Sequence, residues 1–242
     1  MRYHVKGNQV SYGEAVGIMV IENYAPYVPG DTANASSYGF PVRFERLPGS
    51  TPERLFAHDA SLVDAAIEVG KKLVGEGVRA VTGDCGFLAL HQPRIAAELE
   101  VPVFLSSLLQ LDFIDRITGP EAKTGVITAN STSLDRELLD GVTGVPDERL
   151  KIEGLENTTE FVEAVFEEKG SLDTELVEAE VLEIADRLTE DGSVGAILLE
   201  CSLLPPYAAA VQERTGLPVF DYNTMITYVY SSVVRRRFDG FM

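Results

Sequence analysis

The two cysteines are the residues of this sequence best suited to chemistry. The chain of 242 residues contains Cys85 and Cys201 and no other cysteine. Neither lies in a Cys-x-x-Cys motif or a Cys/His cluster that would bind zinc, and two cysteines are too few for a disulfide scaffold in a chain of this length. We therefore expect two unpaired thiols, each of which is either a small buried side chain or an acid/base group.

The two cysteines occupy equivalent positions in an internal repeat. A shift of 116 residues, the separation of Cys85 and Cys201, brings a second stretch of the chain into register with the first. The shift pairs Val78–Leu88 with Val194–Leu204 and Val101–Phe104 with Leu217–Phe220. Similar strand–loop–helix segments recur in many parallel sheets, but chance would rarely place both cysteines on equivalent sites. We interpret the chain as two copies of one α/β unit.

Each cysteine also follows an acid at the end of a predicted strand. Asp84 precedes Cys85, and Glu200 precedes Cys201. Open α/β sheets bind ligands at the carboxyl ends of their strands, so both cysteines lie where a site is expected. If a pseudo-twofold axis relates the two halves, these strand ends face each other across a cleft, and the two thiols flank whatever binds there.

Short apolar segments alternate with longer segments of helical period, which is typical of βαβ units. The longest predicted helices are Pro52–Gly75 and Thr174–Asp191, whereas Asn23–Gly39 and Val142–Arg149 have the Gly, Pro, Asn and Asp content of loops. We predict strands at Val16–Glu22, Val42–Leu47, Val78–Gly83, Val101–Leu105, Gly125–Ala129, Leu150–Gly154, Val194–Leu199 and Leu217–Asp221. The predicted fold class is α/β: two pseudo-twofold-related three-layer αβα halves with mainly parallel sheets, and the active site in the cleft between them.

The repeat also predicts the domain organisation. We expect an N-terminal α/β half over residues 1–113 and a C-terminal α/β half over residues 114–222. A C-terminal helix at about residues 223–242 is expected to join the N-terminal half. The shift aligns this helix with the segment from Ser107 onward, so the two segments are each expected to pack on the opposite half.

Two facing thiols can carry out two-base catalysis. One thiolate removes a proton from a carbon acid while the opposite thiol delivers a proton to the other face. An unperturbed cysteine has a pKa of about 8.5, so the site must hold one sulfur ionised. Helix N-termini after Cys85 and Cys201 favour the thiolate. Asp84 and Glu200 oppose it or accept the thiol proton, and we treat both acids as modulators.

Polar residues that follow strands are candidates for binding a substrate carboxylate. Hydroxyl, amide and backbone N–H groups suit this contact, although the same residue types also cap helices. The candidates are Ser107, Asn130, Ser131, Thr132 and Ser202, together with Gly86 directly after the first cysteine.

The composition limits which partners the protein can bind and in which cellular compartment we expect it. The chain has 38 Asp and Glu against 20 Lys and Arg, a net charge of −18 that would repel a nucleic acid backbone. The apolar runs are too short for a membrane span and no basic leader precedes them, so we expect a cytoplasmic protein. Scarce lysine and abundant acid suggest adaptation to high salt, with an ordinary acidic enzyme as the alternative.

Three segments give the chain a family resemblance. They read Thr-Gly-Asp-Cys-Gly-Phe-Leu-Ala-Leu from Thr82, Val-Pro-Val-Phe-Leu-Ser-Ser from Val101, and Leu-Glu-Cys-Ser-Leu-Leu-Pro-Pro-Tyr from Leu199. With these segments the chain resembles the aspartate/glutamate/hydantoin racemase superfamily over nearly its whole length. The resemblance implies two pseudo-symmetric α/β domains, Cys85 and Cys201 as the catalytic pair, and no metal or pyridoxal phosphate cofactor.

The residues after each cysteine depart from the amino-acid racemases in that superfamily. Gly86-Phe87 and Ser202-Leu203 stand where those racemases tend to have polar residues such as Asn-Thr or Thr-His, so aspartate and glutamate are doubtful substrates. The leading hypothesis is a cofactor-independent isomerase, a racemase or epimerase of a small amino acid or related carbon acid. The alternatives are a cofactor-free decarboxylase or cis–trans isomerase of a small dicarboxylate, and a non-enzymatic small-molecule binding protein. The expected partner is a small molecule with a carboxylate, and a homo-oligomer is an open option.

Overall fold

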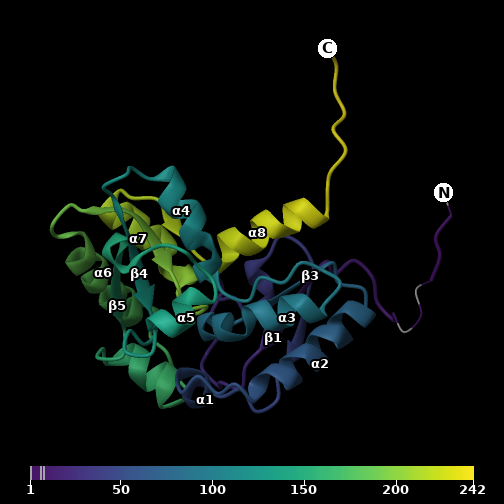
Figure 1. Ribbon diagram of the computed structural model, residues 1–242, viewed down its shortest axis with the longest axis horizontal. Helices are drawn as coiled ribbons and strands as arrows, with labels where there is room; N and C mark the ends of the chain where they lie inside the picture. Colours follow the sequence, from purple (N-terminus) through teal and green to yellow (C-terminus); the bar gives the residue numbers. More distant parts are fainter. Residues whose placement is uncertain (1, 6, 8) are drawn as a thin grey trace.

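Short strands rich in Val and Ile form two parallel β-sheets, one from each half of the sequence (Figure 1). The computed structural model describes residues 2–5, 7 and 9–242. The first sheet contains β1 (Val16–Val20), β2 (Val42–Arg46) and β3 (Ala80–Gly83). The second contains β4 (Lys123–Thr128), β5 (Leu150–Gly154), β6 (Val194–Leu199) and β7 (Val219–Phe220).

The two sheets have the same topology. The first has the order β2-β1-β3, and the second has the order β5-β4-β6-β7. A single parallel bridge between Val81 and Val103 stands in the first sheet where β7 stands in the second. All the paired strands of both sheets are parallel within the part of the chain that the structure describes. The predicted α/β fold of two repeated halves is confirmed.

Helices cover both faces of each sheet because the strand residues are apolar on both sides. In the first sheet, Met19 packs with the residues of α2, whereas Ile18 and Ala80 pack with α8. In the second sheet, Ile197 packs with α6 and α7. The helices are α1 (Pro52–Phe56), α2 (Leu62–Gly75), α3 (Gln92–Glu98), α4 (Leu111–Ile117), α5 (Arg136–Asp140), α6 (Thr174–Thr189), α7 (Ala208–Thr215) and α8 (Tyr222–Val233).

Two helices cross between the halves. The last helix, α8, packs on the first sheet through Tyr222, Met225 and Ile226, and α4 packs against β4 of the second sheet. A boundary between residues 113 and 114 falls inside α4. We propose that the N-terminal half ends before α4 and that α8 completes it.

Most predicted elements differ from the observed ones by one or two residues at an end, and three differ by more. The predicted helix Pro52–Gly75 is two helices, because His58 adopts a left-handed φ of 53° and the Asp59 carboxylate caps the new start at Ser61. The predicted strand Val101–Leu105 pairs only around Val103, where Val81 bonds the Pro102 carbonyl and the Phe104 N–H. Beyond this bridge the Thr82 hydroxyl donates to the Phe104 carbonyl, in place of a backbone N–H of β3.

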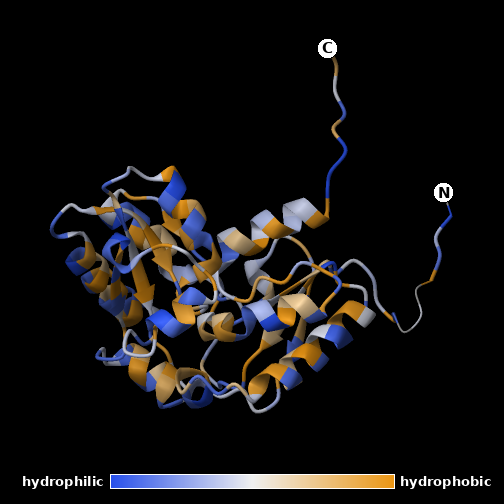
Figure 2. Cartoon of the chain, viewed as in Figure 1, coloured by the Kyte–Doolittle hydropathy of each residue, from blue (hydrophilic) through white to orange (hydrophobic). Residues whose placement is uncertain are grey.

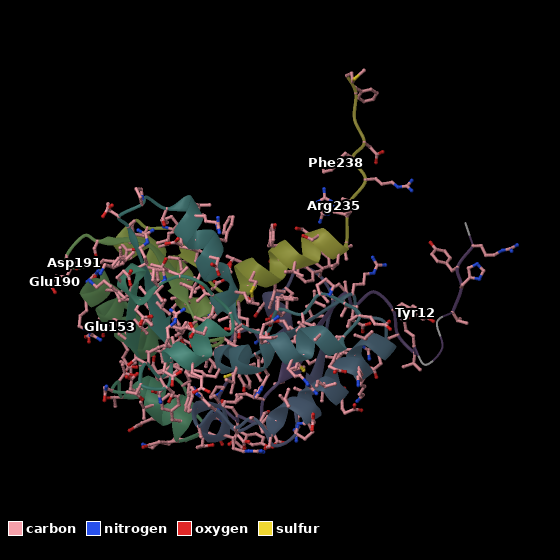
Figure 3. The ribbon with its side chains drawn as sticks, in the orientation of Figure 1. Tyr12, Glu153, Glu190, Asp191, Arg235 and Phe238 are labelled. Atoms are coloured by element: carbon pink, nitrogen blue, oxygen red, sulfur yellow. The ribbon has the colours of Figure 1, made fainter. Side chains whose placement is uncertain are left out.

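The C-terminal helix is shorter than the predicted 223–242. It ends at Val233, and residues 234–242 are extended and mostly exposed. Arg235, Arg236 and Arg237 carry like charges and make no core contact, so nothing stabilises a further helical turn. Figure 3 shows Arg235 and Phe238 on this segment, away from the body of the protein.

The hydropathy of the chain follows this architecture. Figure 2 shows apolar strands and inner helix faces, with hydrophilic residues on the outer faces of the helices. No helix in the described part of the chain is long and apolar enough to cross a membrane.

Candidate active site

The carboxyl ends of four strands meet at one cavity between the halves. In a sheet of order 2-1-3, strands 1 and 3 run into connections that leave on opposite sides, which opens a crevice at their carboxyl ends. Ile21 and Asn23 follow β1, and Asp84 to Phe87 follow β3; from the other half, Ala129 follows β4 and Glu200 to Leu203 follow β6. Both cysteines therefore line the same cavity.

The two thiols are unpaired and poorly hydrated. Cys201 is 7% exposed, Cys85 is half-buried, and neither forms a disulfide. Burial raises the pKa of the Cys85 thiol well above its ordinary value, and the Glu200 and Asp84 carboxylates raise it further. Burial and the Glu200 carboxylate likewise raise the pKa of Cys201. Both sulfurs are thus held as thiols at neutral pH in this state of the protein.

The two acids that precede the cysteines are both buried, and each has one bonded and one unbonded oxygen. One Asp84 oxygen accepts a hydrogen bond from the Ile21 N–H at 2.9 Å, and one Glu200 oxygen accepts one from the Thr128 hydroxyl at 2.7 Å. The other oxygen of each carboxylate is buried without a hydrogen-bond partner in the described structure. Burial raises the pKa of each acid to about 7, against these hydrogen bonds.

Hydrogen bonds between the halves fix both strand ends. The Ser202 hydroxyl donates to the Asp84 carbonyl, and the Ser107 hydroxyl donates to the Leu199 and Glu200 carbonyls at 3.1 Å each. Each acid therefore has its backbone carbonyl bonded by a serine of the opposite half, which restricts relative motion of the two cysteine turns.

An aromatic wall closes the cavity. Phe56 packs edge-on against Phe87, with ring centroids 4.8 Å apart, and against Phe166 at 5.6 Å. Tyr27 completes the lining from the loop after β1. The cavity has a volume of about 30 Å³, which is space for about two water molecules. A molecule the size of an amino acid fits only if part of this lining moves.

Comparison with known proteins identifies the chain's relatives. No protein-family model matches it. A dimethylsulfoniopropionate lyase of Durusdinium sp. clade D is 31% identical over 216 residues, which cover 86% of this chain and 71% of that protein. This chain belongs to the dimethylsulfoniopropionate lyase family. Dimethylsulfoniopropionate lyase 6 of Emiliania huxleyi (strain CCMP1516) is also 31% identical, over 237 residues that cover 91% of this chain. The chain spans about 60% of the length of that relative.

Solved structures place this member of the lyase family in the fold of the aspartate/glutamate racemase superfamily. Allantoin racemase from Pseudomonas fluorescens matches with a TM-score of 0.57 at 16% identity, covering 91% of both chains. Unliganded arylmalonate decarboxylase matches with a TM-score of 0.55 at 18% identity, covering 91% of this chain and 92% of the other. Glutamate racemase from Francisella tularensis, in complex with D-glutamate, matches with a TM-score of 0.55 at 13% identity, covering 93% of this chain and 85% of the other. The fold that the resemblance predicted is confirmed.

In this lyase-family chain, six of the ten predicted site residues line the cavity: Asp84, Cys85, Gly86, Glu200, Cys201 and Ser202. The other four lie outside its lining. Ser107 bonds the backbone of the opposite half, and Ser131 bonds the Glu156 carboxylate. The Asn130 amide oxygen accepts from Thr132 and Ser133 in a tight turn. Hydroxyl and amide groups after a strand have these local partners available, so the structure engages them within the protein.

Other lining residues were missed because they lie far from the cysteines in sequence. Asn23 follows β1, and its amide donates to the Val165 carbonyl at 2.8 Å, which joins the loop after β1 to the second half. Val165 and Phe166 belong to a wide helical turn over Val162–Phe166. The only sequence signal for Asn23 was its position directly after a predicted strand.

A third buried acid stands close to the site. Asp31 is 1% exposed, and its carboxylate accepts from the Ala33 N–H at 2.9 Å. The next residue, Thr32, donates its N–H and its hydroxyl to the Ser202 carbonyl. Burial raises the pKa of Asp31 well above its ordinary value. In the described residues no group of three or more His, Cys, Asp or Glu side chains is arranged to hold a metal ion.

Proposed function

We propose that this chain is a lyase that uses Cys85 and Cys201 to remove the α-proton of a small carboxylate and then expels a leaving group from the β-carbon. The observation that carries the proposal is that the two thiols of a lyase-family chain line one cavity together with two buried carboxylates.

The proposed reaction is an elimination. A thiolate takes the α-proton, so the C–H bond breaks and an S–H bond forms. The electron pair left on the α-carbon forms a double bond to the β-carbon, and the bond to the leaving group breaks with its electrons. With dimethylsulfoniopropionate, the sulfonium leaves as neutral dimethyl sulfide and acrylate remains. The proton on the thiol then passes to water.

The charges around the cavity favour a substrate with a positive group. Asp84 and Glu200 line it, Asp31 lies close by, and none of these acids forms a salt bridge within the described part of the chain. None of the described residues in the lining is Lys, Arg or His. Aromatic faces also attract cations. A sulfonium group suits this environment, and a second carboxylate does not.

A bound cation would also activate the thiols. An opposite charge within about 4–6 Å stabilises the ionised form of an acid. A sulfonium against Asp84 and Glu200 would therefore lower the pKa of both carboxyls and of the neighbouring thiols. Substrate binding would supply the ionisation that burial opposes in the ligand-free site.

A racemase or epimerase is the second candidate, because allantoin and glutamate racemases share the fold and an α-carbanion between two thiols can be reprotonated on either face. The ammonium group of an amino acid would satisfy the same acids. A decarboxylase or isomerase of a dicarboxylate receives less support, because the lining has no cationic side chain for a second carboxylate.

Proton NMR in D₂O separates these reactions in one experiment. The chain is incubated with dimethylsulfoniopropionate, with single enantiomers of amino acids and with an arylmalonate. The proposal predicts vinyl signals of acrylate from the first substrate. Loss of the amino-acid α-proton signal, with inversion measured on the same sample by chiral chromatography, would establish a racemase instead. Signals of the arylacetate product from the arylmalonate would establish a decarboxylase, and no change with any substrate would favour a binding protein.

A further inference from the structure

The Glu200 carboxylate reaches across the cavity to the turn of the first cysteine. Glu200 belongs to the strand end of the second half, yet its Oε1 is the nearest atom to the position that a side chain on Gly86 would occupy. A Cβ at Gly86 would overlap this carboxylate. Oε1 is also buried without a hydrogen-bond partner in the described structure. An unpartnered oxygen beside the Cys85 turn requires an explanation, since burying it is unfavourable.

The equivalent acid of the first half is placed differently. By the repeat, Ser202 stands where Gly86 stands in the other half, and its hydroxyl donates to the Asp84 carbonyl. The Ser202 side chain therefore fills the space that the glycine leaves open for Glu200. The pseudo-symmetry is broken at this pair of residues, and one carboxylate of the two crosses to the opposite cysteine.

We propose that Glu200 governs the ionisation of Cys85 on the opposite half, as well as that of its neighbour Cys201, and that Gly86 is required to admit its carboxylate. The negative charge of the Glu200 carboxylate then acts on both thiols. Glu200 is therefore a positioning residue, because it acts through the two cysteines. This inference concerns the thiols of the proposed function. It is tested without a substrate, so either proposal can fail alone.

The surrounding groups support this coupling. The Glu200 carboxylate is the largest charge effect on both thiols, whereas Asp84 is among the main causes only for Cys85. Tyr27 from the loop and Tyr222 from α8 also face the site, and burial raises the pKa of both phenols, so they stay neutral. Asp31 acts on the Cys201 side.

Alkylation of the thiols tests the proposal directly. In a Cys201→Ser background, iodoacetamide labelling of Cys85 is followed by mass spectrometry as a function of pH. Glu200 ionises at about pH 7, and its charge then disfavours the thiolate. Glu200→Gln should leave labelling unchanged below that pH and accelerate it about tenfold or more near pH 9, which corresponds to about one pKa unit of coupling.

Matched variants separate this charge effect from structural damage. Glu156→Gln, outside the cavity, should leave the profile of Cys85 unchanged. Gly86→Ala and Glu200→Asp, which both withdraw the carboxylate from the Cys85 turn, should shift it in the same direction as Glu200→Gln. In a Cys85→Ser background, Glu200→Gln should accelerate labelling of Cys201, and Asp84→Asn should accelerate it less. In the Cys201→Ser background, Glu200→Gln or Glu200→Asp would overturn the proposal if the folded variant labels Cys85 with the same pH profile as the protein that keeps Glu200. Slower labelling of Cys85 in either variant would overturn it as well.

Discussion

At the residue scale, the two buried acids make stability depend on pH. The pKa of Asp84 is raised from 3.8 to about 7 and that of Glu200 from 4.5 to about 7, so the folded state keeps protons that the unfolded state loses. Their contribution is fully present below about pH 4 and is lost as the pH rises through 7. The rise for Asp84 is about three pKa units, equivalent to on the order of 4 kcal/mol.

Neutral variants should remove this dependence. In urea unfolding between about pH 4.5 and 8, the free energy of unfolding of the wild type should fall, and Asp84→Asn or Glu200→Gln should each flatten the fall. Asp186→Asn, at an acid paired with Arg214 on the surface, is the matched control. A wild-type curve that rises over this interval would show that the acids are not held protonated.

The sequence predicted the site residues that depend on position along a strand. Cys85, Cys201 and their preceding acids lie at strand ends, and parallel strands bring their ends to one edge. It could not predict the direction of side chains such as Ser107 and Asn130, whose hydroxyl or amide groups can satisfy backbone atoms as readily as a ligand. Nor could the sequence show that the Glu200 side chain reaches the turn of Cys85 in the other half, since this contact depends on how the two halves pack against each other.

At the element scale, the contact of Ser107 with the end of β6 should stabilise the interface between the halves. Ser107 is fully buried and bonds the Leu199 and Glu200 carbonyls. Ser107→Ala should lower the free energy of unfolding by about 1–3 kcal/mol, because both carbonyls lose a buried donor. Ser231→Ala, at an exposed hydroxyl within α8, should change it by less than about 0.5 kcal/mol. Equal effects in chemical denaturation would contradict this role.

Element positions were predictable to within a few residues where the apolar pattern was strong. Leu150–Gly154 and Val194–Leu199 have the predicted bounds. The errors fall where side chains decide the local backbone. Asp59 restarts the helix after His58, and the Thr82 hydroxyl takes the Phe104 carbonyl, which would otherwise have extended the strand around Val103. Hydrogen bonds from single side chains to the backbone leave no periodic pattern in the sequence.

At the scale of the whole molecule, the net charge of −18 predicts that salt stabilises the fold. Acids such as Glu190 and Asp191 lie exposed on the outer surface of the second half (Figure 3), and their repulsion is screened within about 3 Å at 1 M salt. The melting temperature should rise by several degrees between 0.1 and 2 M KCl. A melting temperature that does not depend on salt would argue against adaptation to high salt.

The repeat and the fold were predictable because two copies of one pattern reinforce each other. Equal strand orders in the two sheets follow from equal successions of strands and helices. The proposed reaction was not predictable in the same way. Racemases and decarboxylases share this fold, and the proposal of a cationic substrate rests on buried acids without basic partners, an arrangement that appears only when the halves are assembled.

The most direct test of the account is the release of dimethyl sulfide from dimethylsulfoniopropionate by the wild type and by Cys85→Ser and Cys201→Ser, measured in the headspace by gas chromatography. The account predicts release by the wild type and a loss of about 100-fold or more in each variant, since a hydroxyl is a far weaker acid than a thiol. Circular dichroism should show both variants folded. No release by the wild type, or release at the wild-type rate by either folded variant, would contradict the account.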